Sequence, residues 1–263
     1  MNQILKIMVI GAGTRFDIVN GCLDKHKVYP VFAEKSYYNF HGVKYDDNSL
    51  FNLSISENID LVVVAGLNRK LAKCWTTINS IVLHGGRVPQ YRGASVLNWQ
   101  ILNEEQEIYL SILKLSEMYD EGNILIEKSI SNDFISLDQV RDEIDRLFAE
   151  MVLEIVSTRQ FLGPGVEQIG VEKTWEKRYP ENGFFEIKNC SIRDINLLFK
   201  ASELTYRPYF KLEDVYYRLT HIDCASVKDF AKNNDTICRY KDKYYLIKNN
   251  VGYLVKIERL KRN

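Results

Sequence analysis

The stretch Ile81-Val-Leu-His-Gly-Gly-Arg-Val-Pro-Gln-Tyr-Arg-Gly93 runs from a short apolar segment directly into a loop. Ile81–Leu83 is predicted as a buried strand. The loop after it contains four residues that break regular structure, namely Gly85, Gly86, Pro89 and Gly93. Breakers at this density keep the chain out of helix and strand and let its backbone approach a ligand. The single histidine of the stretch, His84, is therefore predicted where a strand ends and a ligand site begins.

A second informative block is Asp120-Glu-Gly-Asn-Ile-Leu125. It places a carboxylate beside a glycine turn, immediately before the apolar run that starts at Ile124. A histidine and an aspartate on loops that flank strands are groups suited to proton transfer at a nucleophilic centre. We therefore predict that His84 and Asp120 act together.

The two blocks together resemble the signature of the folate-dependent formyltransferases. That signature reads roughly Asn-x-His-x-x-x-x-Pro-x-x-Arg-Gly, followed by Asp-x-Gly-x-Ile-Leu about thirty-six residues after the histidine. The chain matches it at His84, Pro89, Arg92, Gly93, Asp120, Gly122, Ile124 and Leu125. It departs from it at Val82, which holds the place of the family asparagine. Asn68, Asn79 or a backbone amide of Gly85 or Gly86 are the candidates to replace that amide.

The composition makes the cytoplasm the expected location, and the resemblance implies an enzyme with N10-formyltetrahydrofolate as co-substrate and no metal. It assigns catalysis to His84 and Asp120. The folate is expected in the crevice of an open parallel sheet, where strand ends offer backbone donors and acceptors. Its expected contacts are Val64, Gly66, Leu67, Arg69, Met118, Tyr119 and Gly122. The expected contacts of the acceptor substrate are Gly85, Gly86, Arg92, Asn98 and Trp99.

The loop and the Leu97-Asn-Trp99 segment after it are most similar to the sugar N-formyltransferases, which act on nucleotide-linked amino-deoxy sugars of bacterial surface polysaccharides such as lipopolysaccharide. Two alternatives stay open. One is a methionyl-tRNA formyltransferase-like enzyme, although those enzymes are longer and carry a basic second domain. The other is a catalytically silent protein that binds folate or a sugar nucleotide, because Val82 lacks the amide.

Outward from the two blocks, short apolar runs alternate with helical patterns, which favours an α/β fold with a Rossmann-like, mostly parallel sheet covered by helices. Strands are predicted at 5–10, 28–33, 61–65, 81–83, 109–115 and 124–130. Helices are predicted after Gly11-Ala-Gly13, over 69–77, and from the cap Ser136 to Phe161. The glycine pair lacks the third glycine of a dinucleotide fingerprint, since Phe16 stands there, and indicates a strand-to-helix turn.

The composition changes near residue 186, where a helix over 191–202 is followed by short β-rich runs at 215–219, 236–240, 244–247 and 253–257. We predict a catalytic domain over residues 1–185 and a small helix-plus-β, OB-like domain over residues 186–263. The stretch from Arg193 through Tyr206-Arg-Pro-Tyr-Phe210 resembles the opening of the second domain of formyltransferases.

Charge and composition exclude several partners. The 263 residues carry 35 Lys and Arg against 35 Asp and Glu, so no global field draws nucleic acid or anionic membrane to the chain. Residues 186–263 hold sixteen basic against ten acidic residues, an excess typical of a solvated face. No apolar run is long enough for a bilayer span. The five scattered cysteines indicate neither a disulfide framework nor a zinc site. The resembling enzymes commonly form homodimers.

Overall fold

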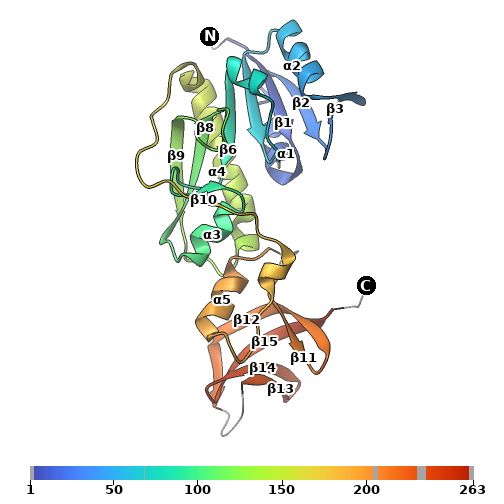
Figure 1. Cartoon of the computed structure of the whole chain (residues 1–263), viewed down its shortest axis with the longest axis vertical. Helices are drawn as coiled ribbons and strands as arrows, with labels where there is room; N and C mark the ends of the chain where they lie inside the picture. The colour runs from blue at the N-terminus through green and yellow to red at the C-terminus, as the bar shows by residue number, and fades with distance from the viewer. Residues whose placement is uncertain (1–2, 68, 204–206, 230–234, 261–263) are drawn as a thin grey trace. The chain divides into compact units, whose positions relative to one another are not determined.

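A computed structural model describes residues 3–67, 69–203, 207–229 and 235–260 of the chain. The fold divides into two compact units (Figure 1). The first comprises Met1–Leu97, Gln106–Ser131 and Arg141–Glu176, and the second comprises Asn98–Glu105, Asn132–Val140 and Lys177–Asn263. The domain boundary predicted at residue 186 stays a prediction.

An eight-stranded sheet forms the first unit, in the order β4-β3-β2-β1-β5-β6-β8-β9. Its centre is parallel, since β2, β1, β5 and β6 run in one direction. The strands on both sides of this centre are antiparallel, so the predicted mostly parallel sheet is a mixed sheet with a parallel centre. The strands are β1 Lys6–Gly11, β2 Lys27–Ala33, β3 Tyr38–Phe40, β4 Val43–Tyr45, β5 Leu61–Ala65, β6 Ser80–His84, β8 Glu107–Lys114 and β9 Ile124–Ser131.

The central strands are buried on both faces, as continuous apolar runs in a parallel sheet require. All five residues of β5 are buried, and Ile7 to Ile10 of β1 are fully buried. Helix α1 (Gly13–Cys22) is joined to α4 (Leu137–Thr158) by Arg15, whose Nε lies 2.8 Å from Oδ1 of Asp145. The predicted apolar stripe of α4 is confirmed at Ile144, Met151 and Ile155, which are fully buried.

Another part of the core lies where β1, β2 and β5 meet helix α2 (Asp47–Ser56) and the 3₁₀ helix η1 (Lys73–Thr77). Its largest fully buried side chains are Tyr38 and Trp75. The sequence did not predict α2, and the helix predicted over 69–77 is wrong in its first half, because only 73–77 is helical. Gly11 to Gly13 form a strand-to-helix turn, as predicted.

The second unit contains a five-stranded antiparallel sheet in the order β11-β12-β15-β14-β13. Helix α5 (Ile192–Lys200) packs on it through Ile195 and Phe199, and its start is capped by Ser191, which pairs reciprocally with Asp194. The separate β-rich tail is confirmed, whereas its OB-like character stays a prediction. Tyr206 of the predicted second-domain motif lies outside the described residues. The strands are β11 Tyr209–Leu212, β12 Val215–Asp229, β13 Thr236–Tyr240, β14 Lys243–Lys248 and β15 Val251–Arg259.

Short elements complete the chain. They are α3 (Val96–Leu102), the two-residue strands β7 (Arg92–Gly93) and β10 (Thr174–Trp175), and the 3₁₀ helices η2 (Gln160–Leu162) and η3 (Pro180–Gly183). The parallel pairing of β7 with β10 fastens the segment after α4 to the histidine loop. No described helix is both long enough and apolar enough to span a bilayer.

Candidate active site

Strand β6 ends at His84, at the carboxyl end of the parallel centre of the sheet. The imidazole is 5% exposed, and both of its ring nitrogens face an acceptor. Nδ1 lies 3.3 Å from Oδ1 of Asp120, and Nε2 lies 2.5 Å from the backbone oxygen of Tyr91. The predicted association of His84 with Asp120 is thus present in the folded chain.

Asp120 is held in the turn before β9 with a left-handed backbone, φ 57°. Its Oδ2 accepts a 2.8 Å hydrogen bond from the backbone N–H of Gly93. Burial alone would raise the pKa of this carboxyl, but the hydrogen bond and charge of His84, the Gly93 amide and the charge of Arg92 together lower it. The carboxylate is therefore ionised at neutral pH and fixes the imidazole.

A neutral imidazole has one donor and one acceptor nitrogen, whereas the imidazolium has two donors. Since carboxylate Oδ1 of Asp120 and the carbonyl of Tyr91 are both acceptors, only the protonated ring satisfies both contacts. This arrangement suits a fixed positive charge that stabilises a developing oxyanion. A role as general base requires the ring first to release one of these two contacts.

Glycines let the backbone pack closely around this pair. A Cβ at Gly86 would lie 2.7 Å from the oxygen of Tyr91 and 3.1 Å from Nε2 of His84. A Cβ at Gly122 would lie 1.7 Å from the oxygen of Lys114. The predicted substrate contacts Gly85 and Gly86 are both buried beside His84.

The parts of the chain that follow β5 and β8, which include the predicted folate contacts, lie next to each other. Nζ of Lys73 is 2.6 Å from Oε1 of Glu117, and Nζ of Lys70 lies 5.7 Å from the ring centre of Tyr119. Gly66 has φ 76°, and a Cβ there would lie 2.7 Å from the oxygen of Ala12, so only glycine fits this turn. The segments after β5 and β8 therefore border one region at the carboxyl ends of the strands.

The side chains of the predicted folate contacts differ in accessibility. Val64 is 3% exposed, and Leu67 packs against the same part of the core. These two positions would therefore contact folate mainly through backbone atoms. Met118 and Tyr119 are more than half exposed. Arg69 is engaged with neighbouring residues of the same unit, as described below.

Arg92, predicted to contact substrate, is 7% exposed and occupied within the protein. Its Nε and Nη2 donate to Oε1 of Gln168 at 3.0 and 2.7 Å. Gln168 in turn donates to the backbone oxygens of Asp120 and Gly122, at 2.7 and 2.8 Å. Sequence reasoning missed Gln168, because no local pattern signals a contact across 48 residues. The pair ties the segment after α4 to the Asp120 turn.

Two aromatic rings secure the same segment. Tyr91 and Trp175 are stacked with ring centres 5.6 Å apart and planes inclined by 7°. Indole Nε1 of Trp175 donates to the oxygen of Gln90 at 3.0 Å. The Tyr91 carbonyl that faces His84 is thereby held in place from the other side of the loop.

Val82 is half-buried and packs against the core. Alternate residues of a strand share a face, so Val82 points to the same side of β6 as His84. Asn79 is too far away to replace the missing amide, since it precedes β6 and lies roughly 16 Å along the strand from His84. Its Nδ2 donates instead to the oxygen of Asp60. Asn68 lies outside the described residues, so the amides of Gly85 and Gly86 are the described candidates.

Asn98 and Trp99 lie on α3, in the second unit. Nδ2 of Asn98 donates to the oxygen of Ala201, and the guanidinium of Arg178 lies 5.4 Å from the ring centre of Trp99. Their predicted contact with substrate stays a prediction. Among the described residues, no three His, Cys, Asp or Glu side chains gather so that they could hold a metal ion.

Comparison with known proteins relates the chain to formyltransferases. A methionyl-tRNA formyltransferase of Synechococcus is 28% identical over 133 residues, which are 50% of this chain and 37% of that protein. A methionyl-tRNA formyltransferase of Finegoldia magna is 27% identical over 200 residues, 73% of this chain and 64% of that protein. The chain thus spans less than two thirds of either relative. No family model matches it.

Solved structures extend the similarity to nearly the whole chain. A methionyl-tRNA formyltransferase from Clostridium thermocellum has a TM-score of 0.72 at 13% identity, covering 98% of this chain and 100% of its own. The chain has the formyltransferase fold. HypX from Aquifex aeolicus in complex with tetrahydrofolic acid has a TM-score of 0.77 at 16% identity, covering 98% of this chain and 45% of its own. An N-formyltransferase from Helicobacter canadensis, in complex with folinic acid and dTDP-3-aminofucose, has a TM-score of 0.60 at 12% identity, covering 97% and 100%.

Proposed function

We propose that this protein transfers a formyl group from N10-formyltetrahydrofolate to an amine, with His84 and Asp120 as its catalytic residues. The observation that carries the proposal is their contact at the carboxyl end of the parallel sheet, with Asp120 in the turn that also contains the expected folate contacts Met118, Tyr119 and Gly122. Formyltransferases are the sequence relatives of the chain, and structural neighbours bind tetrahydrofolate or folinic acid.

The folate supplies an activated formyl group on N10. The uncharged acceptor amine forms a bond to the formyl carbon, and the formyl oxygen becomes an oxyanion. Collapse of that adduct breaks the bond from carbon to N10, and the proton lost by the amine passes to N10. Protonated His84, fixed by Asp120 and Tyr91, stabilises the oxyanion, and a backbone amide of Gly85 or Gly86 replaces the amide that Val82 lacks.

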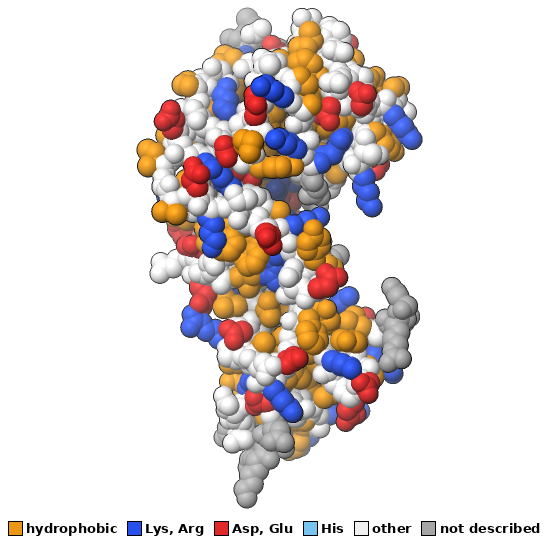
Figure 2. All heavy atoms as spheres, viewed as in Figure 1, with side chains coloured by type: hydrophobic (Ala, Val, Ile, Leu, Met, Phe, Trp, Pro, Cys, Tyr) orange, Lys and Arg blue, Asp and Glu red, His pale blue; other side chains and the backbone are white. Residues whose placement is uncertain are grey.

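For the acceptor we propose a nucleotide-linked amino-deoxy sugar. The histidine loop with Leu97-Asn-Trp99 supports this choice, as does the similarity in fold to an N-formyltransferase in complex with dTDP-3-aminofucose. The second candidate acceptor is methionyl-tRNA, which the sequence relatives favour. The charge of the chain argues against it, because acidic and basic residues are equal in number and are interspersed over the face in Figure 2.

The decisive experiment offers both acceptor classes to the pure protein. The protein is incubated with N10-formyltetrahydrofolate and, in separate reactions, dTDP-, UDP- and GDP-linked amino sugars or charged methionyl-tRNA. A mass increase of one formyl group on a sugar nucleotide supports the proposal. Formylation of the tRNA alone would establish the second candidate. Inactivity with every acceptor, together with retained folate binding, would identify a silent binding protein.

Replacement of His84 by Ala is expected to lower kcat about 10²- to 10⁴-fold, the range that positioned proton-transfer and oxyanion groups contribute. Binding of folinic acid should stay within a few-fold of the natural protein, because His84 is buried and faces Asp120 and Tyr91. Steady-state kinetics and equilibrium titration measure the two quantities separately. A variant with near-normal kcat would remove His84 from the mechanism.

A further inference from the structure

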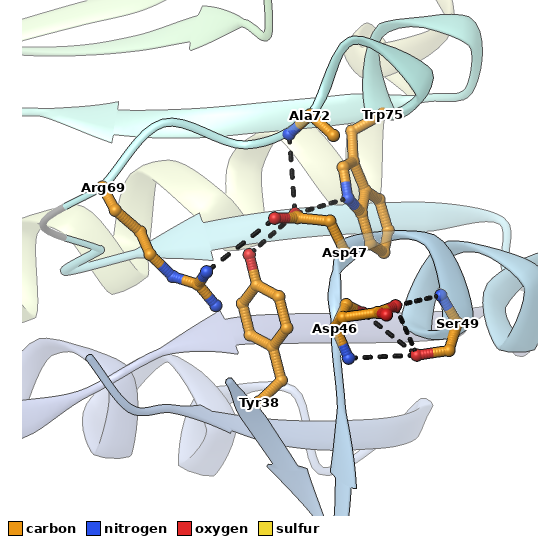
Figure 3. A network of polar contacts seen from close by, with 7 residues as sticks. All are labelled: Tyr38, Asp46, Asp47, Ser49, Arg69, Ala72 and Trp75. Atoms are coloured by element: carbon orange, nitrogen blue, oxygen red, sulfur yellow. Dashed lines mark hydrogen bonds and ion pairs between the residues drawn. The ribbon is translucent and has the colours of Figure 1, made fainter. Parts of the chain in front are cut away.

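Asp47, the first residue of α2, collects donors from three parts of the first unit (Figure 3). Its Oδ1 accepts from the hydroxyl of Tyr38 at 2.9 Å, from Nε1 of Trp75 at 3.3 Å and from the backbone N–H of Ala72 at 3.5 Å. Tyr38 and Trp75 are fully buried. Burial and the neighbouring carboxylate raise the pKa of Tyr38, so its hydroxyl remains a donor.

Arg69 reaches the same carboxylate from the segment that follows β5 (Figure 3). Its Nη1 lies 3.8 Å from Oδ2 of Asp47, and its guanidinium lies 4.0 Å from the ring centre of Tyr38. Its Nε and Nη2 are buried and make no hydrogen bond within the described chain. The charge of Asp47 and the face of the Tyr38 ring therefore hold this guanidinium, rather than a set of hydrogen bonds.

Asp47 thus contacts both ends of the segment Arg69–Ala72, through the side chain of Arg69 and the backbone N–H of Ala72. Arg69 is one of the expected folate contacts, and Nζ of the adjacent Lys70 lies 5.7 Å from the ring centre of Tyr119, another of them. We propose that Asp47 is a positioning residue for the folate pocket, which fixes the wall formed by Arg69–Ala72. This inference rests on the function proposed above.

The physical reason is the cost of an unpaired charge. Without the negative charge of Asp47, the half-buried guanidinium of Arg69 loses the carboxylate that it contacts in Figure 3. The guanidinium then gains by turning toward water, and the short segment that carries it must move too. An amide at position 47 retains an acceptor for Tyr38 and Trp75, so the core beneath keeps its hydrogen bonds.

A neighbouring residue provides the matched control. Asp46 caps the same helix, where its Oδ1 accepts from the backbone N–H of Ser49 at 2.7 Å, and no contact joins it to the segment 69–72 in Figure 3. Asp46→Ala therefore weakens the start of α2 while the contacts of Asp47 stay in place. An effect common to both variants comes from the helix, and an effect confined to Asp47→Asn comes from the network.

The test measures folinic acid binding by equilibrium titration of the 263-residue chain and its variants, with thermal unfolding in parallel. Asp47→Asn should raise the Kd for folinic acid about tenfold, equivalent to roughly 1.4 kcal/mol. In turnover with the acceptor that the experiment above identifies, Asp47→Asn should raise the KM for folate and leave kcat within about twofold. Asp46→Ala should lower Tm and leave the Kd unchanged.

Arg69→Gln and the double variant Asp47→Asn/Arg69→Gln complete the set. If Asp47 acts through Arg69, the double variant should bind folinic acid no more weakly than Asp47→Asn alone. Arg69→Gln removes the same ion pair from the other side. Because Arg69 is itself an expected folate contact, a raised Kd in this variant supports the inference only together with the double variant, whereas an unchanged Kd contradicts it.

Two results would overturn the inference while leaving the proposed function intact. One is an unchanged Kd for folinic acid in Asp47→Asn and Arg69→Gln. The other is an equal rise of the Kd in Asp46→Ala, which would assign the effect to helix stability. Failure of the natural protein to bind folinic acid would instead refute the proposed function, and the role of Asp47 with it.

Discussion

At the scale of single residues, the conformation and contacts of Asp120 are fixed by three features of the structure. Its backbone is left-handed, its Oδ2 is held by the amide of Gly93, and its Oδ1 faces His84. The sequence identified both members of the pair, because loop breakers and spacing are local features. It could not show that Tyr91 supplies the second contact of His84, because a backbone carbonyl leaves no signature in residue identity.

The lowered pKa of Asp120 predicts how its contribution to stability varies with pH. A carboxyl whose pKa is lower in the folded state stabilises the fold above its unfolded pKa, and the contribution disappears as pH falls through the folded pKa. Asp120→Asn should lower the free energy of unfolding by about 1.5–3 kcal/mol at pH 7, the range for hydrogen bonds to charged groups. Urea unfolding at pH 7, 5 and 3 should show the difference between variant and natural protein shrinking only below the ordinary value of 3.8. A difference that is the same at all three pH values would contradict this account.

Val82→Asn tests what replaces the family asparagine. The side chain at position 82 points to the same side of β6 as His84 but packs against the core. If the natural enzyme lacks an oxyanion donor, the added amide should raise kcat between about tenfold and a thousandfold. We expect instead a neutral or lower kcat and a loss of stability of about 1–3 kcal/mol, because on our proposal a backbone amide supplies the donor and the new group is half-buried without a partner. Val82→Ala is the control for loss of the apolar contacts.

At the scale of elements, prediction succeeded where the sequence of the element alone shows a clear apolar pattern. The bounds of β5 were predicted correctly because its five apolar residues are buried on both faces. The long helix α4 was predicted from its apolar stripe. By contrast, α2 was missed because its sequence DNSLFNLSIS has little apolar periodicity and depends on its Asp46 cap. Residues 69–72 read as helical, but contacts of Arg69 and Ala72 with Asp47 hold them in another conformation.

The segment after α4 is expected to act as a support for the Asp120 turn. Gln168→Ala removes two bonds to Arg92 and two bonds to the carbonyls of Asp120 and Gly122. We expect faster amide exchange over residues 164–175 and over the Asp120 turn, and a kcat lowered by roughly tenfold or more through displaced catalytic geometry. Hydrogen-exchange mass spectrometry and kinetics measure these effects. Ile169→Ala is the matched control, since that side chain is 85% exposed. Similar exchange in both variants would show that Gln168 does not support the turn.

At the scale of the whole molecule, fold and charge carry different information about function. The fold is common to enzymes named for different acceptors, methionyl-tRNA and an amino sugar among them, so it does not choose between them. Charge distinguishes them physically, because a polyanionic acceptor needs many cationic contacts and a sugar nucleotide needs few. This chain has equal numbers of acidic and basic residues, and both signs are interspersed on the face shown in Figure 2.

The salt dependence of turnover is therefore predicted to be weak. A protein that neutralises six to ten phosphates loses about 10³- to 10⁵-fold in affinity between 50 and 200 mM salt. A sugar nucleotide presents two phosphates, so its KM should rise by only about tenfold or less over the same range. The KM for folate, measured in the same reactions, serves as the internal control for general effects of salt. A rise of a hundredfold or more in the KM of the acceptor would indicate a long polyanion and favour methionyl-tRNA. A shallow dependence together with formylation of a sugar nucleotide would agree with the balanced charge of the chain.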